Sequence, residues 1–245
     1  MLFRFLACLL LLGGVGVLNA EPPLGPRTPD NILKRYLATA GAQRGMMRDV
    51  SMEVDIEANI PSLKKSGRLT ALRHISKVGK VTYEVVSFMG DNMIKKDVIA
   101  RYMSAEVKSS SNGDAASIAI NAANYRFRYR GMYGDGDWRL HLFELKPRKK
   151  RPGLFEGWLW VEDKTALPVR ESGRFVRTPS VFLKRIEFLR DYRIEDGVAI
   201  PVRIESEIMT RLVGLAKIRI DFTGVSFNGA RADLRARIAA REGGL

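Results

Sequence analysis

Apolar and polar residues alternate along most of this chain, and the pattern predicts a protein built mainly of β-strands. The clearest case is residues 50–60, where six apolar residues alternate with five polar ones. A strand with one buried face produces this pattern, because successive side chains point to opposite faces of the sheet. Further strands are predicted at residues 68–76, 80–88, 125–133, 138–145, 154–161, 167–175, 181–192, 198–208 and 216–222. About nine or ten strands joined mostly by short turns predict an antiparallel sheet that curls or closes.

Two segments have helical rather than alternating periodicity. The first helix is predicted from Asp30, as N-cap, to Gly41, as its stop. The second is opened by Asp91 and continues to Ala105, before a loop at residues 109–114. Two short helices are available to cover the dry, concave side of so wide a sheet. The sheet then either keeps a cavity that holds a ligand or packs shut as a sandwich, and both alternatives stay open.

The N-terminus has the order of a secretory signal peptide. Arg4 supplies the positive region, an apolar run follows, and small residues precede a cleavage site after Ala20. The alternative is an uncleaved anchor, although the apolar run is short for a membrane span. Residues 1–20 are therefore predicted as signal peptide, 21–228 as a single domain and 229–245 as a flexible basic tail. Cleavage removes Cys8, the one cysteine, so the exported chain has no disulfide framework.

The exported chain is strongly basic. Without Arg4 it has 40 basic and 27 acidic side chains, a net charge of +13. A basic balance often indicates nucleic-acid binding, but an exported protein meets phospholipid headgroups, lipopolysaccharide and acidic proteins instead. We therefore expect no nucleic-acid partner. The alternative is that the basic side chains simply cover the solvent faces of the strands.

The residues that carry catalysis are sparse in this chain. The two histidines, His74 and His141, lie on separate predicted strands, and no Cys–His pair is available after export. Asp135 and Asp137 flank Gly136 as in a hairpin turn, without the pattern of a Ca²⁺ loop. No nucleophile elbow, zinc-protease motif or phosphate-binding glycine loop is present. The sequence therefore predicts a protein that is not an enzyme and that uses no metal or cofactor.

One loop concentrates positive charge between two prolines. Its five cations are Lys146, Arg148, Lys149, Lys150 and Arg151. Prolines stiffen a loop, and each basic side chain near an anionic membrane contributes about 1 kcal/mol of attraction. The loop is a candidate contact for anionic lipid or for an acidic partner. The alternative is a solvated loop that discourages association between sheet edges.

Several short motifs of the C-terminal half occur together. They are residues 143–147 (FELKP), 157–161 (GWLWV), 167–170 (LPVR), 190–192 (RDY), 200–201 (IP) and 211–214 (RLVG). As a set, over residues 125–222, they resemble the broad LolA-like group of outer-membrane lipoprotein-sorting proteins. The resemblance implies an α+β fold, mostly antiparallel β: a curved incomplete β-barrel with two or three helices covering its concave face. It also implies binding of acyl chains on that face without chemistry.

These observations lead to the hypothesis of a monomeric periplasmic carrier that shields a lipid or lipoprotein acyl chain during outer-membrane trafficking. Its partners would be a lipid or lipidated protein, with an inner-membrane transporter or an outer-membrane acceptor. The candidate cavity-lining residues are Met52, Val54, Ile56, Tyr83, Val85, Phe127, Tyr129, Ile200, Val202, Ile218 and Ile220. The alternative is a sensor or adaptor of the same fold that binds a protein partner.

Overall fold

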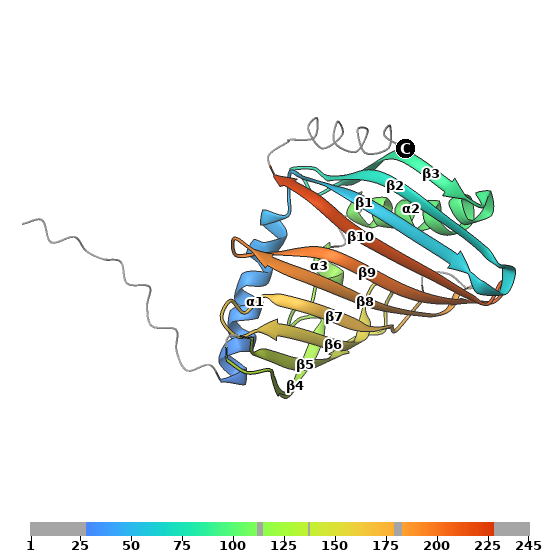
Figure 1. The fold of residues 1–245 in the computed structure, drawn as a ribbon. Helices are drawn as coiled ribbons and strands as arrows, with labels where there is room; N and C mark the ends of the chain where they lie inside the picture. The colour runs from blue at the N-terminus through green and yellow to red at the C-terminus, as the bar shows by residue number, and fades with distance from the viewer. Residues whose placement is uncertain (1–27, 112–114, 137, 179–182, 228–245) are drawn as a thin grey trace, which may run out of the picture.

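Ten strands of this chain form one antiparallel sheet in a computed structural model that describes residues 28–111, 115–136, 138–178 and 183–227 (Figure 1). The predicted signal peptide and basic tail lie outside the described residues. The strands are β1 Val50–Ile60, β2 Lys65–Ile75, β3 Val81–Gly90, β4 Tyr125–Tyr133, β5 Leu140–Pro147, β6 Phe155–Glu162, β7 Pro168–Phe175, β8 Leu183–Glu195, β9 Val198–Thr210 and β10 Leu215–Phe227. The alternation at residues 50–60 therefore predicted the bounds of β1 correctly.

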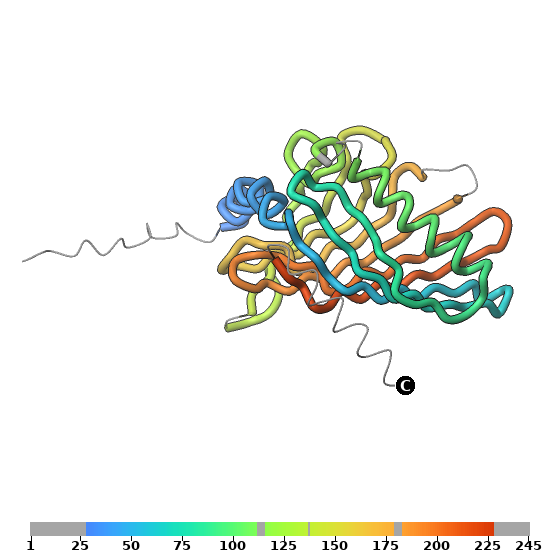
Figure 2. The backbone as a smooth tube through the Cα atoms, turned by 90° about the horizontal axis from the view of Figure 1, so that it is seen from above, coloured from blue at the N-terminus to red at the C-terminus, as the bar shows by residue number. Residues whose placement is uncertain are grey.

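The sheet is open, and its two edges are β3 and β4. The strand order is β3-β2-β1-β10-β9-β8-β7-β6-β5-β4, so β1 pairs with β10 from the far end of the chain. Every other neighbouring pair is consecutive in sequence. The sheet curls over a concave face (Figure 2). The predicted class, a curved antiparallel sheet that is not closed into a barrel and carries a few helices, is confirmed.

Five helical segments accompany the sheet within the described residues. They are α1 Pro29–Met46, the short 3-10 turn η1 Pro61–Leu63, the π-helical segment η2 Ile94–Ile99, α2 Ala100–Ser111 and α3 Ala115–Ile118. The predicted ends of the first helix were wrong. Thr28, not Asp30, is its N-cap, with its side chain accepting a hydrogen bond from the Asn31 backbone N–H. The helix passes through Gly41, because a glycine inside a helix costs only about 1 kcal/mol. None of the helices in the described ranges is long and apolar enough to span a membrane.

Paired glycines allow close approach of strands within the curled sheet. Gly157 on β6 lies opposite Gly173 on β7, and a Cβ at Gly157 would lie 2.0 Å from the Ser172 carbonyl oxygen. Gly67 on β2 lies opposite Gly90 on β3, whose Cβ would lie 2.5 Å from the Gly67 Cα. Only residues without a side chain fit these positions.

The concave face carries two separate hydrophobic cores. The first core lies on β1, β2 and β10 and is covered by η2, through Ile94 and Ile99, with Tyr102 and Met103 of α2 against it. The second core lies on β4 to β7 and is covered by α1, through Ile32 and Tyr36. Helices therefore cover both sides of the concave face, which leaves the middle strands between them.

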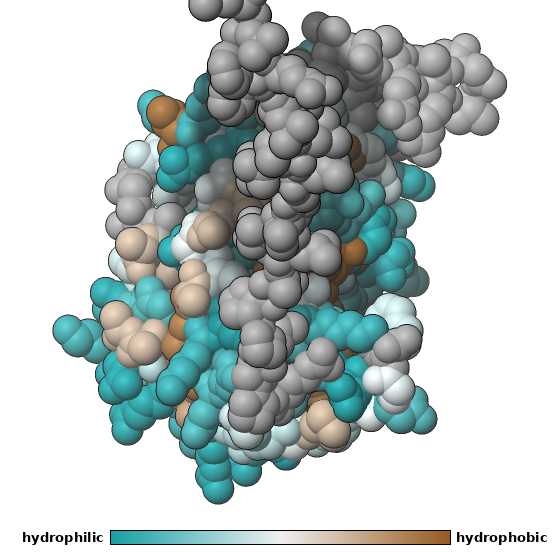
Figure 3. All heavy atoms as spheres, turned by 90° about the vertical axis from the view of Figure 1, so that its left-hand side faces the viewer, coloured by the Kyte–Doolittle hydropathy of each residue, from teal (hydrophilic) through white to brown (hydrophobic). Residues whose placement is uncertain are grey.

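The convex face is charged. Arg68 on β2 forms an ion pair with Asp55 on β1. Beyond the opposite edge of β1, Nε of Arg203 on β9 lies 2.6 Å from Oδ1 of Asp221 on β10. The end of the molecule that carries α1 is also mainly hydrophilic, with scattered apolar side chains (Figure 3). Charged side chains therefore lie on the solvent-facing side of these strands.

Candidate functional site

The middle of the concave face is less buried than its two sides. We call it the central floor and define it by five half-buried side chains. They are Ile186, Phe188 and Arg190 of β8 and Ile204 and Ile208 of β9. The strand register places all five on one face, since Arg190 lies opposite Ile204 and Ile186 lies opposite Ile208. Ile204 in turn lies opposite Ile220 of the first core.

This exposure is unexpected for central strands. In a sheet with a filled concave side, the middle strands are buried most deeply, yet no residue of β8 is fully buried. Ile204 and Ile208 pack against the first core and Phe188 against the second, so the central floor lies where the two cores meet. Its apolar side chains thus keep surface that the described residues do not cover. This arrangement can accept an apolar ligand.

A first polar group lies on the central floor around Arg190. Nη1 of Arg190 donates to Oε2 of Glu171 at 3.1 Å and to the Tyr192 hydroxyl at 3.2 Å. Glu171 is 6% exposed, whereas the Arg190 side chain is 37% exposed. The Tyr192 hydroxyl and the Glu171 carboxylate raise the pKa of Arg190 above its ordinary value, although burial acts in the opposite direction. Arg190 is therefore a permanent cation that solvent can reach on an otherwise apolar floor.

A second polar group joins α2 to the sheet. Glu106 of α2 accepts a hydrogen bond from Nη2 of Arg73 on β2 at 2.6 Å and another from the Tyr83 hydroxyl on β3. Burial opposes the charge on Glu106, but Arg73, Tyr83 and the more distant Arg190 outweigh burial and lower the pKa of this carboxyl. Burial, with the negative charge of Glu106, raises the pKa of the nearby Tyr102. Glu106 therefore links the second polar group to Arg190 electrostatically.

Five predicted cavity-lining residues lie in the closed first core. Met52, Val54, Ile56, Ile218 and Ile220 are all at most 4% exposed. They lie on the concave face as expected, but η2 covers their cluster. A ligand reaches them only if this helix moves.

The other predicted lining residues are more accessible or lie elsewhere. Tyr83 and Phe127 are half-buried against the first and the second core. Val85 and Tyr129 are exposed on the edge strands β3 and β4. On β9, Ile200 is buried and Val202 half-buried. Their contact with lipid stays a prediction.

The basic loop divides into structural and exposed cations. Nε of Arg148 donates to the Ala122 carbonyl, and Nη2 of Arg151 donates to Asn124, so these two arginines hold the loop against the segment before β4. Nζ of Lys146 lies 3.2 Å from Oε1 of Glu144 and forms an ion pair with it. Lys149 and Lys150 are exposed. A contact with lipid or a partner is therefore best expected from these two lysines.

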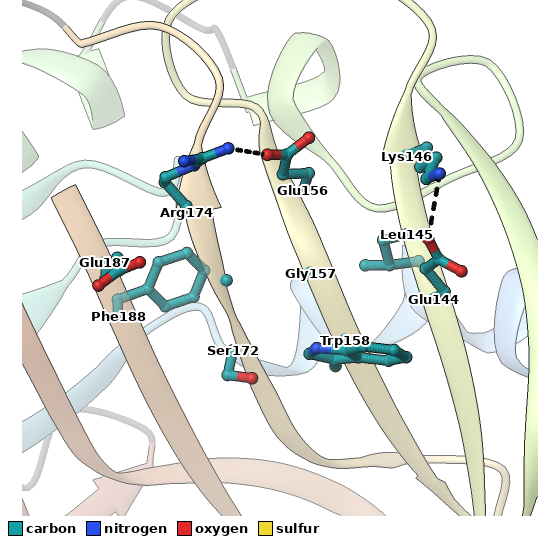
Figure 4. A pocket seen from close by; sticks show the side chains of 11 residues that line it. Glu144, Leu145, Lys146, Glu156, Gly157, Trp158, Ser172, Arg174, Glu187 and Phe188 are labelled. Carbon is teal, nitrogen blue, oxygen red and sulfur yellow. Dashed lines mark hydrogen bonds and ion pairs between the residues drawn. The ribbon is translucent and has the colours of Figure 1, made fainter. Parts of the chain in front are cut away.

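A groove of about 470 Å³ lies on the sheet around Gly157 and Gly173. Figure 4 shows charged side chains along it, with Arg174 pointing toward Glu156 and the Trp158 ring lying flat near Ser172. Opposite charges along this groove neutralise each other in pairs. The groove is open, and charged side chains lie along it beside Trp158 and Phe188.

Each histidine lies against a polar side chain of the neighbouring structure. Nε2 of His141 lies 3.0 Å from Asp163, and His141 is 2% exposed, which leaves a reactant no access to its ring. Nδ1 of His74 lies 3.0 Å from the Ser51 hydroxyl oxygen on the neighbouring strand β1. Within the described residues, no group of three or more His, Cys, Asp or Glu side chains could hold a metal ion.

Arg73 and Arg190 lie on the concave face, and neither was predicted as a residue of the site. The sequence contained a signal for both arginines, because each stands where the alternation of its strand predicts an apolar residue. Arg73 follows Leu69 and Ala71 at two-residue spacing, and Arg190 follows Ile186 and Phe188 in the same way. A cation on the apolar side of a strand predicts an interior charge that needs a partner or a ligand.

No family model matches the chain, and no curated protein does. Among solved structures, the chain is similar to a DUF1329 family protein from Desulfovibrio piger, at 12% identity and a TM-score of 0.44, covering 82% of this chain and 95% of that one. A LolA superfamily protein from Nitrosomonas europaea gives 13% identity and a TM-score of 0.40, covering 80% and 93%. A putative outer membrane lipoprotein-sorting protein domain from Vibrio parahaemolyticus gives 11% identity and a TM-score of 0.40, covering 83% and 96%. The solved structures that this chain resembles thus include LolA superfamily and lipoprotein-sorting domains, and at these identities the likeness concerns the fold alone.

Proposed function

We propose that this protein is a periplasmic carrier that shields the acyl chain of a lipid or lipidated protein on its concave face during envelope trafficking. The observation that supports the proposal is the central floor, whose Ile186, Phe188, Ile204 and Ile208 keep accessible apolar surface between two packed cores. Each methylene buried there contributes about 0.8 kcal/mol. The role needs no chemical step, in keeping with the inaccessible ring of His141.

The carrier would dock on membranes through the end of the sheet opposite α1. The antiparallel order places the ends of β1, β5 and β9 at this end, since they run in the same direction. We call it the far rim. It presents the exposed Leu63 and Leu212 at two turns that are joined by a hydrogen bond from Ser62 to the Val213 carbonyl. Exposed leucines beside cations suit an anionic lipid surface.

The far rim also carries exposed basic side chains. Lys64 in the β1–β2 turn, Arg211 in the β9–β10 turn and Lys149 and Lys150 in the β5–β6 loop are all exposed. Positive charge at one end of a carrier would orient it toward an anionic bilayer before any lipid is transferred.

The carrier proposal is tested by placing a charge on the central floor. Ile204→Glu and Ile208→Glu are expected to weaken uptake of a fluorescent fatty acid at least about tenfold, because a carboxylate must lose water beside an acyl chain. Glu205→Lys changes a charge at an exposed position of β9, next to Ile204, and should leave uptake unchanged. Thermal unfolding of each variant separates lost binding from lost folding.

Mass spectrometry of protein purified from its native envelope provides a second, independent measurement. Co-purified lipid that is absent from the Ile204→Glu variant would support the carrier. Wild-type protein that arrives empty and takes up no fluorescent fatty acid would refute it.

A protein-binding sensor or adaptor is the second candidate function. The observation that favours it is the exposed apolar surface at the β4–β5 hairpin, where Met132 and Tyr133 are about half exposed and Trp138 is 77% exposed. Trp and Tyr are enriched in protein interfaces. If this role is correct, Trp138→Ser abolishes a stable complex in pull-down experiments, whereas Ile204→Glu leaves the complex intact.

A further inference from the structure

We propose that Arg190 binds the anionic head group of the ligand, so that a single-chain acidic amphiphile lies with its head inside the concave face. This inference rests on the proposed carrier function and adds the chemical class of the ligand. A carrier that shields only the chain of a large lipidated protein would leave the polar part outside. Arg190 instead offers a charged contact on the floor itself.

The unused hydrogen-bond donors of Arg190 carry the inference. A guanidinium has five N–H donors in a planar fork that suits carboxylate and phosphate groups. Only Nη1 is used in the described part of the chain, for Glu171 and Tyr192, which leaves Nε and Nη2 without a protein acceptor. The Arg190 side chain is 37% exposed, so a ligand on the central floor can contact this residue.

The surroundings of Arg190 also contain more donors than acceptors. Two arginines and four tyrosines surround two carboxylates, those of Glu106 and Glu171. They are Arg73 and Arg190, whose guanidinium groups only donate, and Tyr36, Tyr83, Tyr102 and Tyr192, whose hydroxyls donate as well as accept. Nε of Arg73 is a fully buried donor without any hydrogen-bond partner in the described residues. A ligand with a negatively charged, acceptor-only head would reduce this excess, whereas a cationic head would increase it.

The floor beside Arg190 is long enough for one acyl chain. Toward α1 the floor ends at the buried Tyr36, and burial together with the nearby Glu171 carboxylate raises the pKa of this tyrosine. In the other direction Phe188 and Ile186 continue along β8 to Leu183, over seven residues or about 23 Å. One leaflet of bilayer hydrocarbon is about 15 Å thick. A chain of ordinary length therefore lies along β8 when its head is at Arg190.

The test compares palmitate with its methyl ester, which has the same chain and no charge. Both compete with a neutral fluorescent probe for the full-length exported protein. Wild type is expected to bind palmitate about tenfold more tightly than the ester, the ratio that about 1.4 kcal/mol gives. Arg190→Gln should remove this preference while ester affinity stays within about twofold, because the chain contacts are intact.

Three further variants make the result specific. Arg190→Lys keeps a charge and should retain part of the preference for palmitate. Arg193→Gln removes an exposed cation from the same strand, where Arg193 pairs with Glu195, and should have no effect. The double variant Arg190→Gln, Glu171→Gln removes both members of the 3.1 Å pair and replaces the single variant if that one fails to fold.

The outcomes separate this inference from the carrier function. Equal affinity of wild type for palmitate and its ester would overturn the role of Arg190 and leave the carrier function intact. A preference for palmitate that survives in Arg190→Gln and in the double variant would do the same. Failure of wild type to bind either ligand would overturn both. Loss of the preference only in the Arg190 variants supports the inference.

Discussion

Glu106 on α2 and Arg73 on β2 form an ion pair across the concave face, with 2.6 Å between Oε1 and Nη2. Arg73 is nearly buried and Glu106 partly so, and Tyr83 also donates to the same carboxylate. This contact ties the helix to strands β2 and β3 at the border of the central floor. Because η2 and α2 are continuous in the chain, the pair also holds the cover of the first core in place.

The first prediction concerns this ion pair. Glu106→Gln should destabilise the protein by about 2–3 kcal/mol, because it leaves the Arg73 charge buried without its counter-charge. Chemical denaturation measures the loss, and hydrogen exchange should increase in α2 before it increases in β6. Replacing both residues with Met should restore most of the stability, since a buried ion pair is often matched by an apolar pair. A double variant as unstable as Glu106→Gln would contradict this explanation.

The second prediction is a pH dependence of the same contact. Burial raises the pKa of Glu106, but Arg73 and the hydrogen bond from Tyr83 more than compensate and lower it below the ordinary value. A carboxyl with a lowered pKa in the folded state stabilises the fold above its unfolded pKa, about 4.3 for Glu. This stabilisation is lost as the pH falls through the lower folded pKa. Wild type should therefore lose protection of α2 below about pH 4. In Glu106→Gln, protection of α2 should not change over this pH range. A variant that loses protection at the same pH as wild type would argue against this role of Glu106.

The third prediction concerns the glycine pair of β6 and β7. A Cβ at Gly157 would lie 2.0 Å from the Ser172 carbonyl oxygen and 2.5 Å from the Gly173 Cα. Both neighbours are backbone atoms, so the strands must separate. Gly157→Ala should cost at least about 3 kcal/mol, or prevent folding. Gly45→Ala is the matched control, because no atom lies within 4 Å of the added methyl. It should stabilise α1 by about 0.5–1 kcal/mol. Equal unfolding midpoints for the two variants would show that the sheet tolerates the change.

The strands were predictable from the sequence because their signal is local. Alternation defines β1 within its own eleven residues, and Asp91 marks the start of the second helix, where its side chain accepts from the Met93 backbone N–H. The pairing of β1 with β10 was not predictable, because it joins residues about 170 positions apart and depends on which apolar faces meet after the chain folds back. It was not predictable either that β3 and β4 form the two edges of the sheet and do not pair with each other.

The site was less predictable than the fold. Alternation placed Met52 and Ile218 on the concave face, but it could not predict that η2 covers their cluster. The central floor is defined by what the helices leave uncovered, which depends on where Ile94 and Tyr36 pack in three dimensions. Arg190 carried a readable signal in its apolar position on β8, and Glu106 carried none, because a carboxylate four residues after Tyr102 is ordinary on a helix.

The last prediction concerns the far rim. Lys149→Glu with Lys150→Glu should weaken binding to phosphatidylglycerol vesicles, because each basic side chain near an anionic surface contributes about 1 kcal/mol and its reversal adds repulsion. Two lysines predict a loss of at least about thirtyfold at low salt, from about 2 kcal/mol. The matched control is Lys77→Glu with Lys80→Glu, the same change of charge in exposed side chains at the α1 end. Vesicle co-sedimentation at two salt concentrations measures both variants, and binding of wild type should fall as salt screens the charges. Equal losses for the two double variants would show that net charge, rather than the far rim, attracts the protein to the membrane.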